Sequence, residues 1–419
     1  MTGKGYRIRR RRQSHHGATE QAGGWVAPVP ASLPLVPQGE AEMLSTPEQV
    51  RDWVEHARSL GVVGYDTEFI GEASYFPMLC VVQLATSERV ALIDPLGGLP
   101  LTPVWELLAD EAVVKVVHAG LQDLEPVVRH LRRPPAAVFD TQIAAGFAAM
   151  RYPIGLRDLL HAMVGVELGK GLTFTSWDQR PLSPRHLHYA AEDVRYLVAL
   201  HAALRTRLES MGRLEWAEQE FQSLMAMETY VFDPLVQCER VKSGGMATPR
   251  AQAVLVALVA FRDELARERD CPPRSLIKDG VLIDMARKPP MSLDRLQHVA
   301  DLPRPVKQEA GERLLAVIRA AKAAPVTALP GKVVVKDFAR ERDAVDALWA
   351  RVVQRCEAEL LSPALVVSRR EVTRFHMEAV GEFRGPPPTR PVGETLLRGW
   401  RGKVLGDILM QHLASRGTV

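Results

Sequence analysis

The sequence predicts an α/β domain, built on a mixed β-sheet flanked by helices, followed by one or two small all-α domains. Three apolar strand patterns occur in succession near the N-terminus and are followed by alternating helix and strand patterns, which indicates a mixed sheet. Beyond about residue 183 the apolar spacing becomes helical. A chain of 419 residues with 47% apolar residues is long enough for two to three domains, each with a buried core.

The overall charge and the cysteines narrow the class of protein. With 25% charged residues and a net charge of +3, the chain is compatible with a nucleic-acid partner, although this bias alone does not demonstrate one. The four cysteines are far apart, so we expect neither a zinc site nor a disulfide framework, and a reducing cytoplasm fits. No apolar run approaches the ~18 residues of a membrane span. We expect a cytoplasmic, monomeric protein without a membrane partner.

Residues 1–42 are predicted to form a disordered tail, because a basic cluster is followed by a stretch rich in Gly, Pro and Ala. The arginines at 9–12 are followed by polar residues rather than an apolar segment, which excludes an export signal. The cluster could contact nucleic-acid phosphates, or the tail could have no dedicated role. The first domain is expected at 43–232. It begins with a capping box, in which Thr46 is the N-cap and Gln49 the third helical residue.

Apolar runs predict the strands of this domain, at 62–69, 78–85, 90–93 and 113–117. The short connections between the first three strands are typical of antiparallel pairing. Helical spacing follows at 121–131. Later, Ser183 and Pro184 suit the start of a long helix that should continue to about residue 208, and a helical stretch at 214–230 closes the domain.

The remaining chain contains a weak internal repeat. Apolar and proline positions between 273 and 285 are matched between 363 and 375, and a helical pattern precedes each block. We therefore predict two helical domains, at 245–324 and 337–419.

The first candidate site residues are Asp66, Thr67 and Glu68, at the end of the first predicted strand. Residues i and i+2 of a strand share a face, so the two carboxylates repel each other unless they are solvated or a cation lies between them. Because the preceding residues are apolar, the pair lies at the mouth of a core strand, where hard oxygen ligands suit Mg²⁺ or Mn²⁺. Taken alone, such a pair is more often a solvated strand end.

Two further motifs carry candidate residues. Asp123 is expected in the first turn of a helix, where the helix dipole favours negative charge, and alone that effect explains it. Tyr189 and Asp193 are four residues apart, so both lie on one face of the long helix. Alone, they are also explained by packing of the tyrosine and exposure of the carboxylate.

Together, these motifs resemble the tyrosine-bearing branch of the DEDD 3′→5′ exonuclease superfamily, and within it the ribonuclease D family. The order agrees: D-x-E on a first strand, an aspartate at a later helix start, and Y-x-x-x-D on a late helix. The local sequences also agree, in the segments at 65–69, 118–124, 155–159, 176–182 and 189–194. The resemblance covers roughly residues 45 to 325 well.

The resemblance implies an RNase H-like fold and two divalent ions, Mg²⁺ or Mn²⁺. Asp66 would bridge the two ions, and Glu68 and Asp193 would bind the ion that activates the water. Asp123 would act on the second ion, and Tyr189 would orient the attacking water. Hydrolysis of a phosphodiester requires a deprotonated water and neutralisation of the leaving oxygen, and two ions about 4 Å apart supply both.

Six residues near these motifs are candidate substrate contacts: Thr67, Phe69, His118, Lys170, Trp177 and Arg180. Lysine and arginine could hold phosphates, and the tryptophan could stack on a base. The alternative is that Trp177 anchors the core and Arg180 forms a local ion pair.

The segment at 262–278 resembles the HRDC domain of ribonuclease D proteins and some helicases, and the copy at 337–419 is more degenerate. The implied role is nucleic-acid docking or shaping a channel to the active site, with plain structural support as the alternative. The expected function is therefore a 3′→5′ exoribonuclease that releases nucleoside 5′-monophosphates from RNA, with tRNA precursors as the family's substrate. A DNA 3′→5′ exonuclease would use the same site, and a catalytically inactive RNA-binding scaffold is disfavoured because all five site residues are present.

Overall fold

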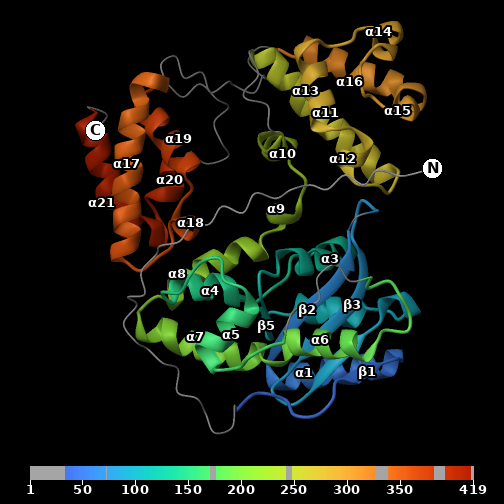
Figure 1. The fold of residues 1–419 in the computed structure, drawn as a ribbon, viewed down its shortest axis with the longest axis vertical. Coiled ribbons are helices and arrows are strands. Elements are labelled where there is room, and N and C mark those ends of the chain that lie inside the picture. Colours follow the sequence, from blue (N-terminus) through green and yellow to red (C-terminus); the bar gives the residue numbers. More distant parts are fainter. Residues whose placement is uncertain are drawn as a thin grey trace, which may run out of the picture.

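The computed structural model describes residues 34–71, 73–169, 176–241, 248–325, 338–381 and 392–416. An α/β domain forms one end of the molecule, and two helical domains lie at the opposite end, one at the upper left and one at the upper right of the view (Figure 1). None of the helices in these ranges is long and apolar enough to cross a membrane.

The α/β domain is built on a six-stranded mixed sheet with the order β1-β4-β3-β2-β5-β6. Its strands are β1 (Glu42–Leu44), β2 (Val62–Ile70), β3 (Met78–Ala85), β4 (Val90–Ile93), β5 (Val114–Val117) and β6 (Val138–Asp140). The three strands β2, β3 and β4 pair antiparallel, whereas β1, β5 and β6 join in parallel. The predicted mixed sheet is confirmed.

Helices cover both faces of the sheet. One face packs against α1 (Pro47–Leu60), α2 (Thr102–Leu108) and α3 (Leu121–Leu131). The other face packs against α4 (Thr141–Phe147), α5 (Leu156–Val164), α6 (Pro184–Arg195), α7 (Leu197–Ser210) and α8 (Leu214–Phe221). The capping box at Thr46 and Gln49 is present as predicted, and it fixes the start of α1.

The pairing of β2 with β3 contains a bulge that bears on the site. Glu68 lies opposite Val81, but Phe69 lies opposite Leu79, so Cys80 is an extra residue on β3. Because successive side chains of a strand alternate between faces, Tyr65 and Thr67 point toward α3 while Asp66 points toward α6. The Asp66 side chain therefore faces α6, the helix that carries Tyr189 and Asp193.

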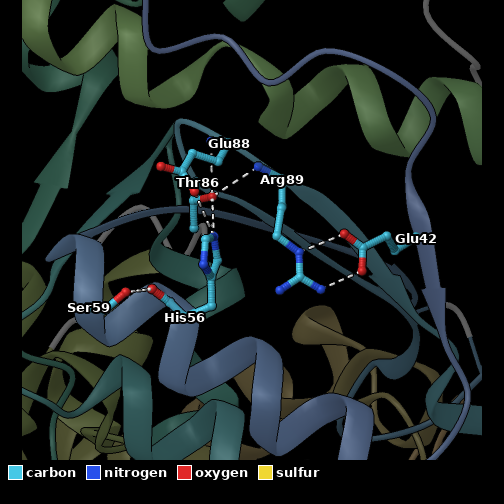
Figure 2. Close-up of polar contacts among 6 residues, drawn as sticks. All are labelled: Glu42, His56, Ser59, Thr86, Glu88 and Arg89. Carbon is cyan, nitrogen blue, oxygen red and sulfur yellow. Dashed lines mark hydrogen bonds and ion pairs between the residues drawn. The ribbon is translucent and has the colours of Figure 1, made fainter.

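The predicted tail at 1–42 is too long. Residues 34 to 42 belong to the described structure: Arg195 of α6 donates to the Pro37 carbonyl (2.8 Å), and β1 begins at Glu42. Figure 2 shows how this edge strand is held, because both carboxylate oxygens of Glu42 accept from the Arg89 guanidinium (2.7 and 2.5 Å). Nearby, His56 of α1 bonds to Thr86 (3.1 Å). The basic cluster lies outside the described residues.

Two predicted helices are interrupted. The long helix expected from Ser183 to about residue 208 divides at Tyr196 into α6 and α7. At this point the helix backbone lies against Gly64 of β2, where a Cβ would be 3.1 Å from the Val194 carbonyl oxygen. The stretch at 214–230 forms α8, a 3₁₀ turn and the short helix α9 (Met227–Tyr230).

The two predicted helical units are present, with different packing. The first contains α11 (Pro249–Glu268), α12 (Pro273–Leu276), α13 (Asp279–Arg287), α14 (Leu293–Gln297), α15 (Arg304–Glu309) and α16 (Gly311–Ala323). Its core also includes Cys238 and Val241, at and beyond α10 (Pro234–Arg240), so the unit begins before the predicted residue 245. The second contains α17 (Phe338–Ala358), α18 (Pro363–Val366), α19 (Arg369–Ala379), α20 (Val392–Leu396) and α21 (Gly399–Ser415). The four-residue helices α12 and α18 occupy corresponding places, as the sequence repeat predicts.

Candidate active site

Strand β2 carries two of the predicted site carboxylates. Asp66 and Glu68 are both partly exposed and share the sheet face that α6 covers. Gly64 lies two residues before Asp66 on the same strand. It allows the α6–α7 junction to approach β2 closely, since a Cβ at this position would be 3.0 Å from the Leu197 Cβ. The glycine therefore sets the distance between β2 and α6, which carry candidate site residues.

A tight turn between β5 and α3 positions Asp123. Ala119 has a φ of 56°, and a Cβ on Gly120 would be 2.5 Å from the Val117 Cβ, so only glycine fits at 120 without rearrangement. The buried carboxylate of Asp140 accepts from the amides of Ala119 (3.2 Å) and Gly120 (3.1 Å). Asp140 also caps α4, so one side chain fixes the turn and the start of a helix.

Two residues of β2 hold Asp123 directly. The buried Tyr65 hydroxyl donates to the Asp123 carbonyl (2.9 Å), and the Thr67 hydroxyl donates to the Asp123 carboxylate. Asp123 is 8% exposed, so its charge is largely removed from water. The helix-start effect alone, which explained this residue in the sequence, does not account for these two bonds from the neighbouring strand.

Helix α6 presents Tyr189 and Asp193 toward the same region. Ser183 caps the helix and forms a capping box with His186, which fixes where α6 begins. Tyr189 and Asp193 lie one turn apart on the same face, and the Tyr189 hydroxyl acts as a hydrogen-bond donor that lowers the pKa of Asp193. The ring of the buried Trp177 packs beside Tyr189, with ring centroids 6.1 Å apart.

The four carboxylates form one negatively charged cluster. Burial raises the pKa of Asp66 well above its ordinary value, and the charges of Asp123, Asp193 and Glu68 raise it further. Burial and the neighbouring aspartates raise the pKa of Glu68 to about 8. Burial raises the pKa of Asp193 to about 7, although the bond from Tyr189 opposes this. Such a cluster is unfavourable without a positive charge among the carboxylates.

The residues present fit a divalent cation. Both amide atoms of Gln83 are buried without a hydrogen-bond partner, and Gln83 lies directly opposite Asp66 on the same sheet face. Carboxylates and an amide suit a hard, partly hydrated ion. Within the described residues, no three His, Cys, Asp or Glu side chains are already arranged as a ligand set, so ions would have to draw the carboxylates together.

Two predicted substrate contacts, Trp177 and Arg180, are instead engaged in contacts within the protein. Trp177 is 4% exposed and packs in a small core with Cys80 and Ala190, so it cannot stack on a base. The Arg180 guanidinium bonds to both carboxylate oxygens of Asp94 (2.6 Å for the Nη2 bond) and to the Cys80 carbonyl (2.8 Å). The alternative interpretation of Trp177 as a core anchor is correct, and Arg180 forms an ion pair as that interpretation expected, but its partner Asp94 is distant in the sequence and not local.

The remaining predicted contacts divide into three kinds. Both ring nitrogens of His118 are engaged, with Thr141 (2.9 Å) and with the Ile154 carbonyl (3.1 Å), so this residue also has a structural position. Thr67 supports Asp123 and, like Phe69, lines a cavity next to the site. Lys170 lies outside the described residues.

Gln83 and Asp140 were missed by the sequence reasoning. Gln83 is a single amide in an otherwise apolar strand, which is a signal, but its pairing with Asp66 depends on the strand register. Asp140 precedes a helix, so the sequence indicates only an ordinary N-cap. Its second task, holding the turn before Asp123, depends on β5 and β6 being neighbours.

Comparisons with known proteins agree with this geometry. A family model described as 3′-5′ exonuclease matches residues 41–209, which include all five site residues. A model of the HRDC domain matches residues 251–318, within the first helical unit.

Relatives extend the match over most of the chain. Ribonuclease D of Gluconacetobacter diazotrophicus is 35% identical over 87% of this chain and 91% of its own length. Ribonuclease D of Escherichia coli K12 is 29% identical over 88% of this chain and 97% of its own length. The crystal structure of E. coli RNase D, described as an exoribonuclease involved in structured RNA processing, superimposes with a TM-score of 0.77 over 90% of this chain and 99% of that chain. The chain belongs to the ribonuclease D family of 3′→5′ exonucleases.

Proposed function

We propose that this protein hydrolyses RNA from its 3′ end and releases nucleoside 5′-monophosphates, using two divalent ions held by Asp66, Glu68, Asp123 and Asp193. The observation that carries the proposal is the cluster of four carboxylates with raised pKa values, on a chain that matches ribonuclease D over most of its length. We propose Mg²⁺ or Mn²⁺ as the ions, because both prefer carboxylate oxygens.

Each side chain of the cluster has a distinct task. Bound ions would lower the pKa of the attacking water and neutralise charge on the leaving 3′ oxygen. Asp66, whose pKa is raised by burial and by the charges of all three other carboxylates, would contact both ions, while Glu68 and Asp193 would hold the water side and Asp123 the leaving-group side. The Tyr189 hydroxyl, next to Asp193, would orient the water; its pKa is raised by burial and by Asp193, so it acts as a hydrogen-bonding group and not as a base.

The hydrolysis balances with one water per nucleotide. The water oxygen forms a bond to phosphorus, the bond between phosphorus and the 3′ oxygen breaks, and that oxygen takes a proton to become the new 3′ hydroxyl. The products are a shorter RNA and a nucleoside 5′-monophosphate. We propose tRNA precursors or other structured RNA 3′ ends as substrates, acted on in the cytoplasm by a monomer, and HRDC-like function for the helices at 338–415 as well as for the first unit.

Degradation of labelled RNA tests the proposal. A tRNA precursor and a matched single-stranded DNA, each labelled at the 3′ nucleotide, are incubated with Mg²⁺, Mn²⁺ or EDTA. We expect release of labelled nucleoside 5′-monophosphate from RNA with metal and no release with EDTA. Asp66→Asn should abolish nearly all activity. Glu192→Gln is the matched control, because Glu192 is already bonded to Arg195 (2.6 Å) and Tyr196 (2.9 Å).

Three outcomes would contradict the proposal in different ways. Full activity of Asp66→Asn would remove the site assignment. Faster degradation of the DNA than of the RNA would favour the DNA exonuclease. Binding of RNA without cleavage, with either metal, would favour a catalytically inactive scaffold.

A further inference from the structure

A cavity of about 650 Å³ lies between the nuclease domain and the first helical domain. The β2–β3 hairpin and α3 line it on the nuclease side, and α11 and α12 line it on the other side. Thr67, which lies between two catalytic carboxylates in the sequence, forms part of its wall. The cavity therefore adjoins the active site without containing the carboxylates.

We propose that this cavity binds the unpaired RNA segment immediately upstream of the scissile phosphate, with Phe76 and Arg129 as its main contacts. The inference rests on the proposed function, because it names where the same substrate lies. Its volume is that of a pocket for a small organic molecule, so it would hold on the order of one or two nucleotides.

The lining has the chemistry of a single-strand binding site. The aromatic residues Phe69, Phe76, Tyr230 and Phe232 line it together with the cations Arg129, Arg240, Arg267 and Arg274, of which Arg267 pairs with Asp263 and Arg274 with Asp279. Proteins that bind single strands combine aromatic faces, on which bases stack, with cations that follow the phosphates. Arg262 also lines the cavity, but its guanidinium is bonded to Asp279 and to the Ile277 carbonyl, so it supports the helical domain.

Phe76 and Arg129 lie against each other in the lining of the cavity. The Arg129 guanidinium lies 4.7 Å from the centre of the Phe76 ring. The Arg129 Nε is one of four buried side-chain nitrogen or oxygen atoms, among the described residues, that have no hydrogen-bond partner. Glu125 is 3.7 Å from it, which is an ion pair but too long for a hydrogen bond. The Nε atom itself is buried, but the Arg129 side chain as a whole is 23% exposed and lines the cavity, so a phosphate or base edge there would contact the accessible part of the guanidinium.

The position of the cavity agrees with the polarity of the reaction. Tyr189 and Asp193 lie on the water side of the scissile phosphate, so the leaving 3′ oxygen departs from the opposite side in an in-line displacement. The proposed roles assign Asp123 to that opposite side, and Thr67, which is bonded to Asp123, lines the cavity. The upstream RNA is attached to the leaving oxygen and therefore belongs there. A second cavity, of about 600 Å³, is lined by Tyr189 and Asp193 and lies on the water side.

Tyr75 closes the cavity at the tip of the β2–β3 hairpin. Its amide donates to Asp270 (3.0 Å), its hydroxyl donates to Asp263 (2.8 Å), and Arg267 donates to the hydroxyl (3.0 Å). These contacts join the hairpin that contains Phe76 to the helical domain. The lining of the cavity is therefore continuous across the two domains.

Binding measurements separate this inference from catalysis. In an Asp66→Asn background, a short 5′-fluorescent oligoadenylate is titrated with protein and Kd is measured by anisotropy. We expect Phe76→Ala and Arg129→Gln each to weaken binding by about tenfold, within the range of one lost base stack or phosphate contact. Arg205→Gln is the charge-matched control on α7, where Arg205 pairs with Glu209 away from the cavity (2.9 Å). A fully paired, blunt RNA duplex should bind more weakly than the oligoadenylate.

Hydrolysis by the otherwise unaltered enzyme provides the second readout. Phe76→Ala and Arg129→Gln should lose more activity on oligoadenylate, mainly through KM, than on the small ester thymidine 5′-monophosphate p-nitrophenyl ester. Kd values within twofold of the parent for both variants would overturn the inference. If either variant fails to fold, Phe76→Leu and Arg129→Lys replace them, with the same criterion.

The two proposals fail in different ways. If the parent degrades RNA while both variants bind and degrade it normally, only the cavity assignment is wrong. If the parent binds RNA through Phe76 and Arg129 but releases no nucleotide with any metal, the cavity assignment holds and the proposed catalytic function is wrong.

Discussion

The two helical domains begin with a similar succession of a long, a four-residue and a medium-length helix, but they are attached to the nuclease domain in different ways. The C-terminal domain shares one continuous apolar core with α4, α5, α7 and α8 of the nuclease domain. Trp400 lies at this junction, with its ring 4.8 Å from that of Phe147 between centroids, and it is 2% exposed. The first helical domain has a separate core and meets the hairpin mainly through the polar contacts of Tyr75.

This difference indicates that one helical domain can be fixed to the nuclease domain while a similar one can move relative to it. An apolar junction between domains behaves like the interior of one domain and unfolds with it, because separating it exposes apolar surface. A polar junction exchanges its hydrogen bonds for bonds to water at small net cost. We therefore expect the C-terminal domain to be a fixed part of the nuclease and the first helical domain to be able to open.

The largest effect is expected at the apolar junction. Trp400→Ala should lower the free energy of unfolding by about 3–5 kcal/mol, the range for truncation of a large buried aromatic side chain. Chemical denaturation followed by fluorescence and by circular dichroism should show the nuclease and C-terminal helices losing stability together. Met410→Ala, on the exposed side of the same helix, is the control, with a change within about 0.5 kcal/mol. Unfolding of the C-terminal helices alone would contradict a shared core.

Metal ions should stabilise the nuclease in a pH-dependent way. Because the pKa values of Glu68 (about 8) and Asp193 (about 7) are raised, the folded protein binds more protons than the unfolded chain between about pH 4.5 and pH 8. In EDTA, stability should therefore fall as the pH rises through this window, by about 2–4 °C in Tm for each kcal/mol lost. Mg²⁺ or Mn²⁺ should reverse the loss, more at pH 8 than at pH 5. Stabilisation by the metal should extend to the C-terminal helices. A Tm that is insensitive to metal at pH 8 would contradict the assignment of the metal site.

Acid should loosen the C-terminal domain before the first helical domain. The buried His376 bonds to His412 (2.8 Å) and Glu341 (2.8 Å), and burial with the nearby positive charges lowers the pKa of His412 to about 4. The unfolded chain therefore binds more protons below about pH 6.5, and stability is lost as the pH falls from there to about 4. We expect a loss of about 2 kcal/mol, read as faster hydrogen exchange in α19 and α21. His412→Gln should remove most of this pH dependence.

The smallest effect is expected at the polar junction. Tyr75→Phe removes the hydroxyl that Asp263 and Arg267 share, at a cost of about 1 kcal/mol. The Tm of the nuclease core should not change, but hydrogen exchange should increase in the hairpin and in α11. Tyr152→Phe, at the junction with the C-terminal domain, is the matched control. Equal protection of the hairpin from hydrogen exchange in Tyr75→Phe and Tyr152→Phe would show that the Tyr75 hydroxyl does not stabilise the junction.

Much of the nuclease fold follows from local patterns in the sequence. The capping box at Thr46, the helix start at Ser183 and Pro184, and the apolar runs of β3 and β4 depend on neighbouring residues alone, so these positions could be predicted. The motif carboxylates were predicted for the same reason. The division of the long helix at Tyr196 could not be predicted, because it occurs where the helix backbone meets Gly64 of a distant strand.

The errors concern residues whose surroundings come from distant parts of the chain. Trp177 and Arg180 resemble exposed loop residues, but β3 and Asp94 enclose them. The Tyr75 contacts join residues almost two hundred positions apart, and Gln83 faces Asp66 only because of the β2–β3 register. Spacing along the chain predicts which side chains share a face of one element, whereas tertiary packing decides which of them remain accessible.

The bulge in β3 has a further consequence for the active site. Cys80, the extra residue, lies outside the regular ladder, and its carbonyl accepts from Arg180, three residues before the cap of α6. An irregularity in one strand thus serves as the anchor for the loop that leads into α6, the helix that carries Tyr189 and Asp193. Removing the extra residue would restore a regular ladder, but it would also change where α6 begins relative to β2. The spacing between the first and third catalytic motifs is therefore determined partly by a residue that belongs to neither motif.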